Sequence, residues 1–211
     1  MYRVRDPAHR CQALKIYRAQ ALASGASWHA RLRQLRRVQG AGPGASVRLV
    51  YRQRAWQGVL LPYVPGESLS GLLASRVEGS LPLHEARLAF LAILRSLERL
   101  HERGAYHGDL HEGNIMLSRC GTGFRAAFID PLPQPGAVSA LQERDLVEAV
   151  RVFAWMLGGT ASYAGQPCWV RRILGGLQGR RILARHASVT ELLASVRRGS
   201  STRAGPGLSR R

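Results

Sequence analysis

The segment AYHGDLHEGNIML, residues 105–117, holds side chains whose types and spacing suit the binding of a charged ligand. It contains Asn114, the only Asn of the chain, and, five positions earlier, Asp109, one of only four Asp residues. His and Gly residues surround both, and apolar residues bound the segment on each side. A purely structural loop has no use for such a polar cluster, so we predict a ligand site here.

Lys15 is the only Lys among 31 basic Lys and Arg residues, in a chain of net charge +18. A charge of this size can reflect an anionic partner, such as nucleic acid, an anionic membrane surface or a phosphorylated sugar. The arginines are scattered, however, and aromatic residues do not alternate with them as in single-strand binders. A GC-rich coding sequence explains the excess of Arg, and we do not predict nucleic-acid binding.

The composition predicts a globular protein in a reducing compartment. A chain of 211 residues, 45% of them hydrophobic, is long enough to bury a core. We expect no transmembrane segment, because no apolar run reaches the roughly 18 residues that a span needs, and no secretion signal. Cys11, Cys120 and Cys168 lie far apart, which argues against a zinc site and a disulfide framework. We therefore expect a cytoplasmic location.

The hydrophobic pattern predicts a strand-rich N-terminal part followed by a larger helical part. A helix at 20–38 carries Leu32, Leu35 and Val38 on one side, and Ser68 is placed to cap a short helix. The expected strands are 2–6, 11–18, 47–53 and 56–64, with a hairpin at 114–130. The expected later helices are 69–75, 83–103, 144–159, 168–177 and 188–197. The predicted fold class is α+β, with a β-rich lobe (1–64), a helical lobe (65–197) and a disordered basic tail (198–211).

The sequence HGDLHEGNIML resembles the catalytic loop of the protein-kinase-like superfamily. Its H-G-D-L-H-x-x-N form is that of aminoglycoside phosphotransferases and of related small-molecule and lipopolysaccharide kinases. ALKIY resembles the strand whose Lys contacts nucleotide phosphates, and FID resembles the segment whose Asp holds magnesium. The order Lys15, Asp109, Asn114, Asp130 matches the family. The resemblance covers residues 2–197 and implies a bilobal fold, with a small antiparallel sheet lobe and a larger helical lobe.

The resemblance implies a kinase that uses ATP and Mg²⁺. Asp109 would accept or orient the proton of an acceptor hydroxyl, and Lys15 would contact the α- and β-phosphates. Asn114 and Asp130, on adjacent strands of the hairpin, would be the magnesium ligands, since Mg²⁺ prefers hard oxygen atoms.

The resemblance also implies an adenine site at the connection between the lobes. The Pro62 carbonyl would accept a hydrogen bond from the adenine amino group, and the Val64 N–H would contact the ring. Ala13 and Met116 would enclose the base from the two lobes, although plain core packing explains both residues almost as well.

Two other groups of residues have more than one interpretation. By the family pattern, Asp145 would accept backbone N–H groups of the catalytic loop from the start of a central helix, but a simple N-cap explains it about as well. His107 and His111 have the spacing of a metal pair. The segment around Gly108 is a poor helix, however, and no third strong ligand lies nearby.

The sequence departs from the family pattern in its N-terminal lobe. No Gly-rich loop precedes residues 2–6, and no acidic residue lies between Asp6 and Glu67 to pair with Lys15. We therefore expect Lys15 to be unpaired and free to swing. Three explanations stay open: a start further upstream, a nucleotide held by fewer contacts, or a catalytically dead pseudokinase scaffold.

The acceptor is indicated by the length of one link. Only fourteen residues separate Asp130 from Asp145, without the longer activation segment of a regulated protein kinase. This favours a hydroxyl on a small molecule or glycan, and the basic charge suits an anionic one. A compact serine/threonine protein kinase is the alternative. Contact with an anionic membrane surface stays open.

Overall fold

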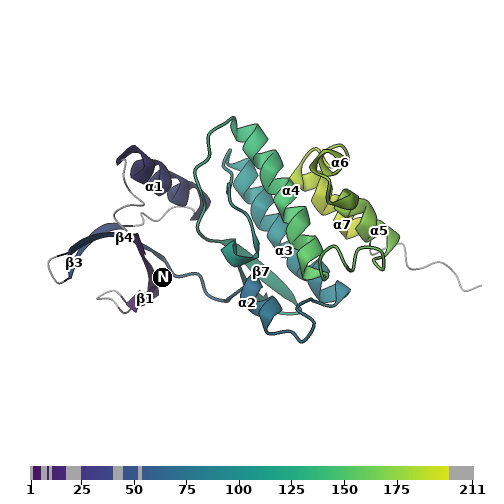
Figure 1. Cartoon of the computed structure of the whole chain (residues 1–211), viewed down its shortest axis with the longest axis horizontal. Helices are drawn as coiled ribbons and strands as arrows, with labels where there is room; N and C mark the ends of the chain where they lie inside the picture. Colours follow the sequence, from purple (N-terminus) through teal and green to yellow (C-terminus); the bar gives the residue numbers. More distant parts are fainter. Residues whose placement is uncertain are drawn as a thin grey trace, which may run out of the picture.

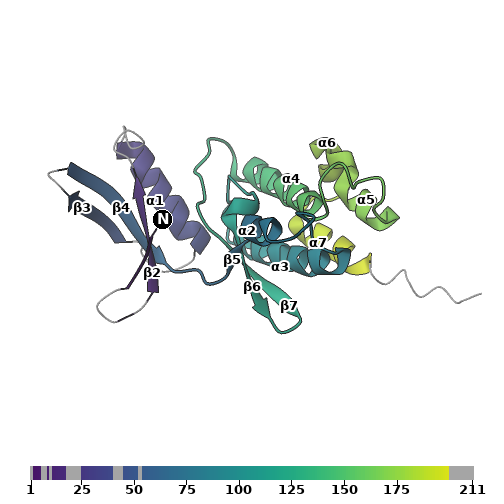
Figure 2. The same ribbon diagram turned by 60° about the horizontal axis from the view of Figure 1, so that its bottom comes forward.

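The computed structural model describes residues 2–5, 9, 11–17, 25–39, 45–51 and 54–199. It has two lobes, which lie at opposite ends of the views in Figures 1 and 2. The small lobe contains a four-stranded sheet and one helix, and the large lobe contains the remaining helices and a three-stranded sheet. The predicted α+β bilobal class is confirmed.

The small lobe is an antiparallel sheet covered by α1 (Gly25–Gln39). Its strands are β1 (Tyr2–Arg5), β2 (Cys11–Tyr17), β3 (Ala45–Tyr51) and β4 (Arg54–Pro62), in the order β1-β2-β4-β3. Leu35 of α1 packs with three sheet residues, Ala13, Val59 and Leu61, to form a small core. Leu35 and Val38 are buried and Leu32 is half-buried, so the predicted apolar side of this helix is confirmed. The first residues predicted for the helix, 20–24, lie outside the described part.

The core of the large lobe is built around α3 (Leu83–Glu102) and α4 (Val138–Met156). The rings of Phe90 in α3 and Phe153 in α4 stack in parallel with 4.3 Å between their centroids. The apolar positions of α3 recur at helical spacing and are buried, because that side of the helix faces the core. The other helices are α2 (Leu69–Ala74), α5 (Cys168–Leu174), α6 (Gly179–Leu183) and α7 (Val189–Arg198). The predicted cap is confirmed, since the Ser68 hydroxyl accepts the Gly71 N–H at 3.1 Å.

The second sheet lies where the two lobes meet. Its strands are β5 (Glu67–Ser68), β6 (Ile115–Cys120) and β7 (Gly123–Phe128), paired antiparallel in that order. The predicted hairpin is therefore present, but its outer bounds were wrong. Asn114 ends the 3₁₀ helix η2 (Glu112–Asn114) just before β6, and Asp130 lies two residues beyond β7. Both therefore flank the open end of the hairpin, where loop backbone can aim a side chain away from the sheet.

Helix α4 begins six residues earlier than the sequence pattern predicts. Its N-cap is Ala137, which makes no side-chain capping bond, so Asp145 lies inside the helix and its interpretation as an N-cap is wrong. The first turn lies within the segment that the sequence presents as a Pro-rich link, which concealed the helix start. Leu141 is buried in this added part, and its packing explains why the helix extends upstream.

His186 is a buried polar residue far from the hairpin, between α6 and α7. Neither of its ring nitrogens has a hydrogen-bond partner among the described residues. Burial is the main reason that its pKa lies below the ordinary value; Glu191 opposes this shift, and Arg185, Arg172 and Arg198 add to it. Within the described ranges, no helix has the length and apolar character that crossing a membrane requires.

Candidate active site

The loop between α3 and β6 is held by a buried carboxylate from α4. Asp145 is only 1% exposed, and its two oxygens accept the backbone N–H groups of His107 at 2.6 Å and Gly108 at 2.9 Å. The expectation that Asp145 accepts loop N–H groups is confirmed. Because these donors are buried, the two bonds fix the backbone immediately before Asp109.

His107 connects this loop to the end of β7. Its Nε2 donates to the Ile129 carbonyl at 2.9 Å, and its Nδ1 accepts the Asp109 N–H at 3.3 Å. Burial lowers the pKa of His107, while the hydrogen bond to Ile129 opposes that shift, so the neutral ring fits this pattern. With both nitrogens engaged, His107 cannot form a metal pair with His111, and no metal cluster of His, Cys, Asp and Glu occurs in the part of the chain that the structure describes.

Asn114 is oriented by the residue five positions before it. Its Nδ2 donates to the Asp109 carbonyl at 2.9 Å and lies 3.4 Å from Asp109 Oδ2. Among the described residues, nothing donates a hydrogen bond to its amide oxygen, so this hard donor atom remains available. The Asp109 side chain is about half exposed, at 47%, and reaches solvent, with His111 Nε2 at 3.9 Å from its Oδ2.

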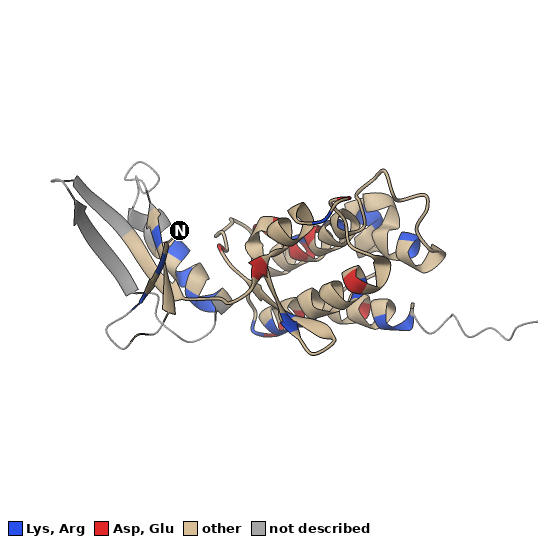
Figure 3. Ribbon diagram, turned by 90° about the horizontal axis from the view of Figure 1, so that it is seen from below, with Lys and Arg blue, Asp and Glu red and all other residues tan. Residues whose placement is uncertain are grey.

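Lys15 reaches across the lobes and forms an ion pair with Asp130 Oδ1. The expectation of an unpaired, freely swinging Lys15 is therefore wrong. The described part of the small lobe carries no Asp or Glu, as Figure 3 shows, and the ammonium group instead meets a carboxylate of the large lobe. Asp130 adopts the left-handed backbone conformation, with φ at 55°, which Asp tolerates better than most residues and which is common at functional sites.

These contacts bring the four predicted side chains to one place between the lobes. Asn114 contacts Asp109, and the Asn114 carbonyl accepts the N–H of Ile129 at 3.0 Å, directly before Asp130. Lys15 then pairs with Asp130 from the other side. The site thus combines one cation, two carboxylates and one amide oxygen.

A cavity of about 200 Å³ adjoins this cluster. Ala13, Pro62, Val64 and Met116, the residues predicted to hold the base, all line it together with Asp130. The sequence did not indicate the further lining residues Tyr2, Arg3, Leu61, Tyr63 and Ile129. Tyr63 stands between two predicted residues in the sequence, whereas Arg3 enters through the pairing of β1 with β2, a register that the sequence does not reveal.

The sequence also did not indicate two polar residues that support the loop. Gln34 of α1 is 2% exposed, and its Nε2 donates to the Tyr106 carbonyl at 2.5 Å, which ties the small-lobe helix to the loop. Gln134, in the segment after Asp130, donates to the Gly108 carbonyl at 3.3 Å. Glutamines have no special signal in a sequence, because their roles here depend on packing between distant segments.

Gly108 is required by the close approach of the segment after Asp130. Its φ is +83°, and a Cβ atom there would overlap the Leu132 carbonyl oxygen. The Leu132 N–H in turn donates to the His107 carbonyl at 3.0 Å. The short link after Asp130 is therefore packed against the catalytic-loop backbone.

Comparison with solved structures defines the fold. The PknI kinase domain of Mycobacterium tuberculosis is 18% identical to this chain, with a TM-score of 0.67 over 94% of this chain and 89% of that one. A double mutant of the same domain gives 18% identity and a TM-score of 0.68 over the same shares. No protein-family model and no curated protein matches the sequence. The chain therefore has the fold of the protein-kinase-like superfamily.

Proposed function

We propose that the protein is an ATP- and Mg²⁺-dependent phosphotransferase that phosphorylates a hydroxyl group. The observation that carries this proposal is the convergence of Lys15, Asp109, Asn114 and Asp130 beside a cavity that spans the two lobes. Phosphoryl transfer depends mainly on positioning and on neutralising phosphate charge, and these four side chains supply both.

The donor atoms present fit the predicted metal. Asn114 has its amide nitrogen engaged and its oxygen available, and Asp130 Oδ1 is buried with the Lys15 ammonium beside it. An amide oxygen and a carboxylate, completed by phosphate oxygens and water, are a usual Mg²⁺ set. Mg²⁺, when bound, would neutralise phosphate charge.

The residues of the chain then have distinct roles in transfer. The hydroxyl oxygen of the acceptor bonds to the γ-phosphorus as the bond to the β-phosphate oxygen breaks, and Asp109 takes the hydroxyl proton. Asp109 suits this role because its carboxylate reaches solvent while Asp145 and Asn114 fix its backbone. Lys15 would share its charge between Asp130 and the phosphates, and Ala13, Pro62, Val64 and Met116 would enclose the base.

The acceptor class is the part of the proposal that experiment must decide. The short link favours a small molecule or glycan, because it leaves no long segment to form a peptide platform. The solved neighbours are PknI kinase domains, so a protein hydroxyl fits at least as well. Radiolabelled ATP should therefore be offered in parallel with casein-like proteins and with sugars or aminoglycosides.

The test separates transfer from nucleotide binding. Asp109→Asn should reduce transfer about 10²- to 10⁴-fold, the usual contribution of a general base, and should keep the thermal stabilisation by Mg-ATP. Lys15→Met and Asp130→Asn should weaken that stabilisation as well. Glu143→Gln, an exposed carboxylate change on α4, is the matched control. Equal transfer by wild type and Asp109→Asn would refute the assignment.

A scaffold that retains the fold without catalysis is the second candidate. It is favoured by the ion pair between Lys15 and Asp130, which satisfies both charges without a ligand. No thermal shift with Mg-ATP, together with no effect of Asp130→Ala on ligand response, would support this alternative.

A further inference from the structure

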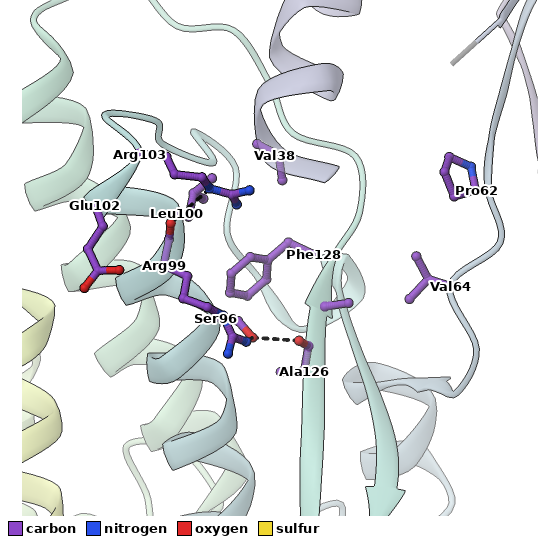
Figure 4. A pocket seen from close by; sticks show the side chains of 11 residues that line it. Val38, Pro62, Val64, Ser96, Arg99, Leu100, Glu102, Arg103, Ala126 and Phe128 are labelled. Carbon is purple, nitrogen blue, oxygen red and sulfur yellow. Dashed lines mark hydrogen bonds between the residues drawn. The ribbon is translucent and has the colours of Figure 1, made fainter. Parts of the chain in front are cut away.

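A groove lies behind the connection between the lobes, on the other side from the nucleotide cavity. Two adjoining cavities of about 440 and 490 Å³ form it, and they share Val64, Ser96, Arg99, Ala126 and Ala127. Figure 4 shows the first of them, between α3, β7 and the segment that carries Pro62 and Val64. We call the two cavities together the back groove.

The wall of the back groove is basic. Arg95, Arg99 and Arg103 line it at successive i, i+4 positions of α3, and Arg125 lines it from β7. None of these four guanidinium groups pairs with a carboxylate among the described residues. The single carboxylate in the lining, Glu102, points away from Phe128 in Figure 4.

This arrangement is unfavourable for the isolated helix. Like charges at i, i+4 each destabilise a helix by about 0.2–0.5 kcal/mol, and α3 has two such pairs here. Elsewhere in the described chain, Arg76 and Arg119 share Glu85, and Arg151 pairs with Glu148. The absence of a carboxylate is therefore particular to the groove, although arginine is abundant in the whole chain.

The floor of the groove is apolar and its backbone polar groups are satisfied. Ala126, Ala127 and Phe128 form it, and the Ala126 carbonyl accepts the Ser96 hydroxyl at 2.7 Å. Nucleobases would find no open aromatic face, because Phe124 and Phe128 are buried and the Arg119 guanidinium covers the Phe124 ring at 4.4 Å. A second copy is disfavoured by the net charge of +18.

We propose that the back groove binds an acidic peptide segment of a partner protein, with small or aliphatic side chains seated on the alanine floor. Arg95 and Arg103 are eight residues apart, or about 12 Å along the helix. An extended segment covers that distance with about four residues, so alternating acidic and apolar side chains would meet the arginines and the floor in turn. Arg is the side chain best suited to bidentate binding of such carboxylates.

The position of the groove links it to the nucleotide cavity. Pro62 and Val64 line both the groove and the cavity of about 200 Å³, and Met116 does so as well. A peptide that shifts this shared wall changes nucleotide affinity, and by linkage the nucleotide changes peptide affinity by the same factor. This coupling rests on the proposed function, whereas peptide binding itself does not.

The test uses fluorescence anisotropy with a short fluorescein-labelled peptide in which Asp and Glu alternate with Leu. We expect it to bind the full chain, and a peptide with Ser in place of Asp and Glu to bind at least about tenfold more weakly. Arg95→Glu and Arg99→Glu should each raise the Kd about tenfold or more, with Arg99→Gln intermediate. Arg171→Glu, an exposed Arg of α5 outside the groove, is the control and should change the Kd less than about twofold.

Three results would overturn the proposal: no binding of the acidic peptide, equal binding of the Ser peptide, or equal weakening by Arg171→Glu. Tighter binding of labelled oligothymidylate, lost in the same groove variants, would assign the groove to nucleic acid instead. Thermal denaturation establishes that each variant is folded, and Arg99→Gln serves if Arg99→Glu is not. An unchanged peptide Kd with saturating Mg-ADP would refute the coupling, and absence of nucleotide binding would refute the proposed function while leaving the groove result intact.

Discussion

Replacing Asp145 with Asn tests how the catalytic loop is held. The carboxylate of Asp145 accepts two backbone N–H groups, at 2.6 and 2.9 Å, and is almost fully buried. An Asn side chain has the same shape but only one acceptor oxygen, so its NH₂ group would face one of the two donors. The variant therefore removes one bond and places two donors against each other without creating a cavity.

The expected magnitude follows from these contacts. A hydrogen bond to a charged group contributes about 1.5–3 kcal/mol, and a buried donor left unsatisfied costs about 1–3 kcal/mol. We expect Asp145→Asn to lower the free energy of unfolding by about 2–4 kcal/mol. For a protein of this size, 1 kcal/mol corresponds to about 2–4 °C in Tm, so Tm should fall by about 5–15 °C.

Urea denaturation followed by circular dichroism measures this difference. Glu148→Gln is the matched control, because it makes the same chemical change one turn along α4 and removes only the exposed pair with Arg151, worth less than about 1 kcal/mol. A loss in Asp145→Asn no larger than in the control would refute the inference that Asp145 holds the loop.

Gly108→Ala should lower the free energy of unfolding by about 1–3 kcal/mol in urea titrations and impair transfer, because its positive φ and the Leu132 carbonyl leave no room for a Cβ atom. Gln34→Leu should cost about 1–2 kcal/mol in the same titrations, since the buried Tyr106 carbonyl loses its donor. Stability should fall as the pH drops below about 6.5: the folded pKa of His186 lies below its unfolded value, so the unfolded chain binds the proton first. His186→Phe should reduce that slope by up to about 1.4 kcal/mol per pH unit, as measured by unfolding at several pH values.

Each of these predictions has its own check. Gly104→Ala also has a positive φ but nothing within 4 Å of its Cβ position, so an equal loss there would show that crowding at Gly108 has no effect. Equal stability of Gln34→Leu and wild type would mean that solvent replaces the donor. His107 also has a pKa lowered by burial, so part of the pH slope should persist in His186→Phe. An unchanged slope in that variant would exclude His186 as a source.

The sequence was most informative where residue types are rare. Lys15, Asn114 and Asp130 were identified because their side-chain types are scarce in this chain, and the structure brings them together with Asp109. The helices with strong apolar periodicity, such as α3, were also predictable, because burial of one side imposes that spacing.

The sequence was least informative where a role depends on distant packing. The early start of α4 lies in a Pro-rich stretch, and only the packing of Leu141 reveals it. The ion pair of Lys15 could not be predicted, because the expected partner was sought in the same lobe. Gln34 acts through a contact with Tyr106, 72 residues away, and nothing in its local sequence indicates this.

The bond from Gln34 to the Tyr106 carbonyl means that the two lobes are already connected through the loop that leads to Asp109. A rotation that separates the lobes would break this bond and expose a buried carbonyl to water. The conformational entropy of arranging the loop is therefore lost once, during folding, and is not lost again at each encounter with a ligand. Such preorganisation leaves more of the interaction energy of a ligand for its affinity.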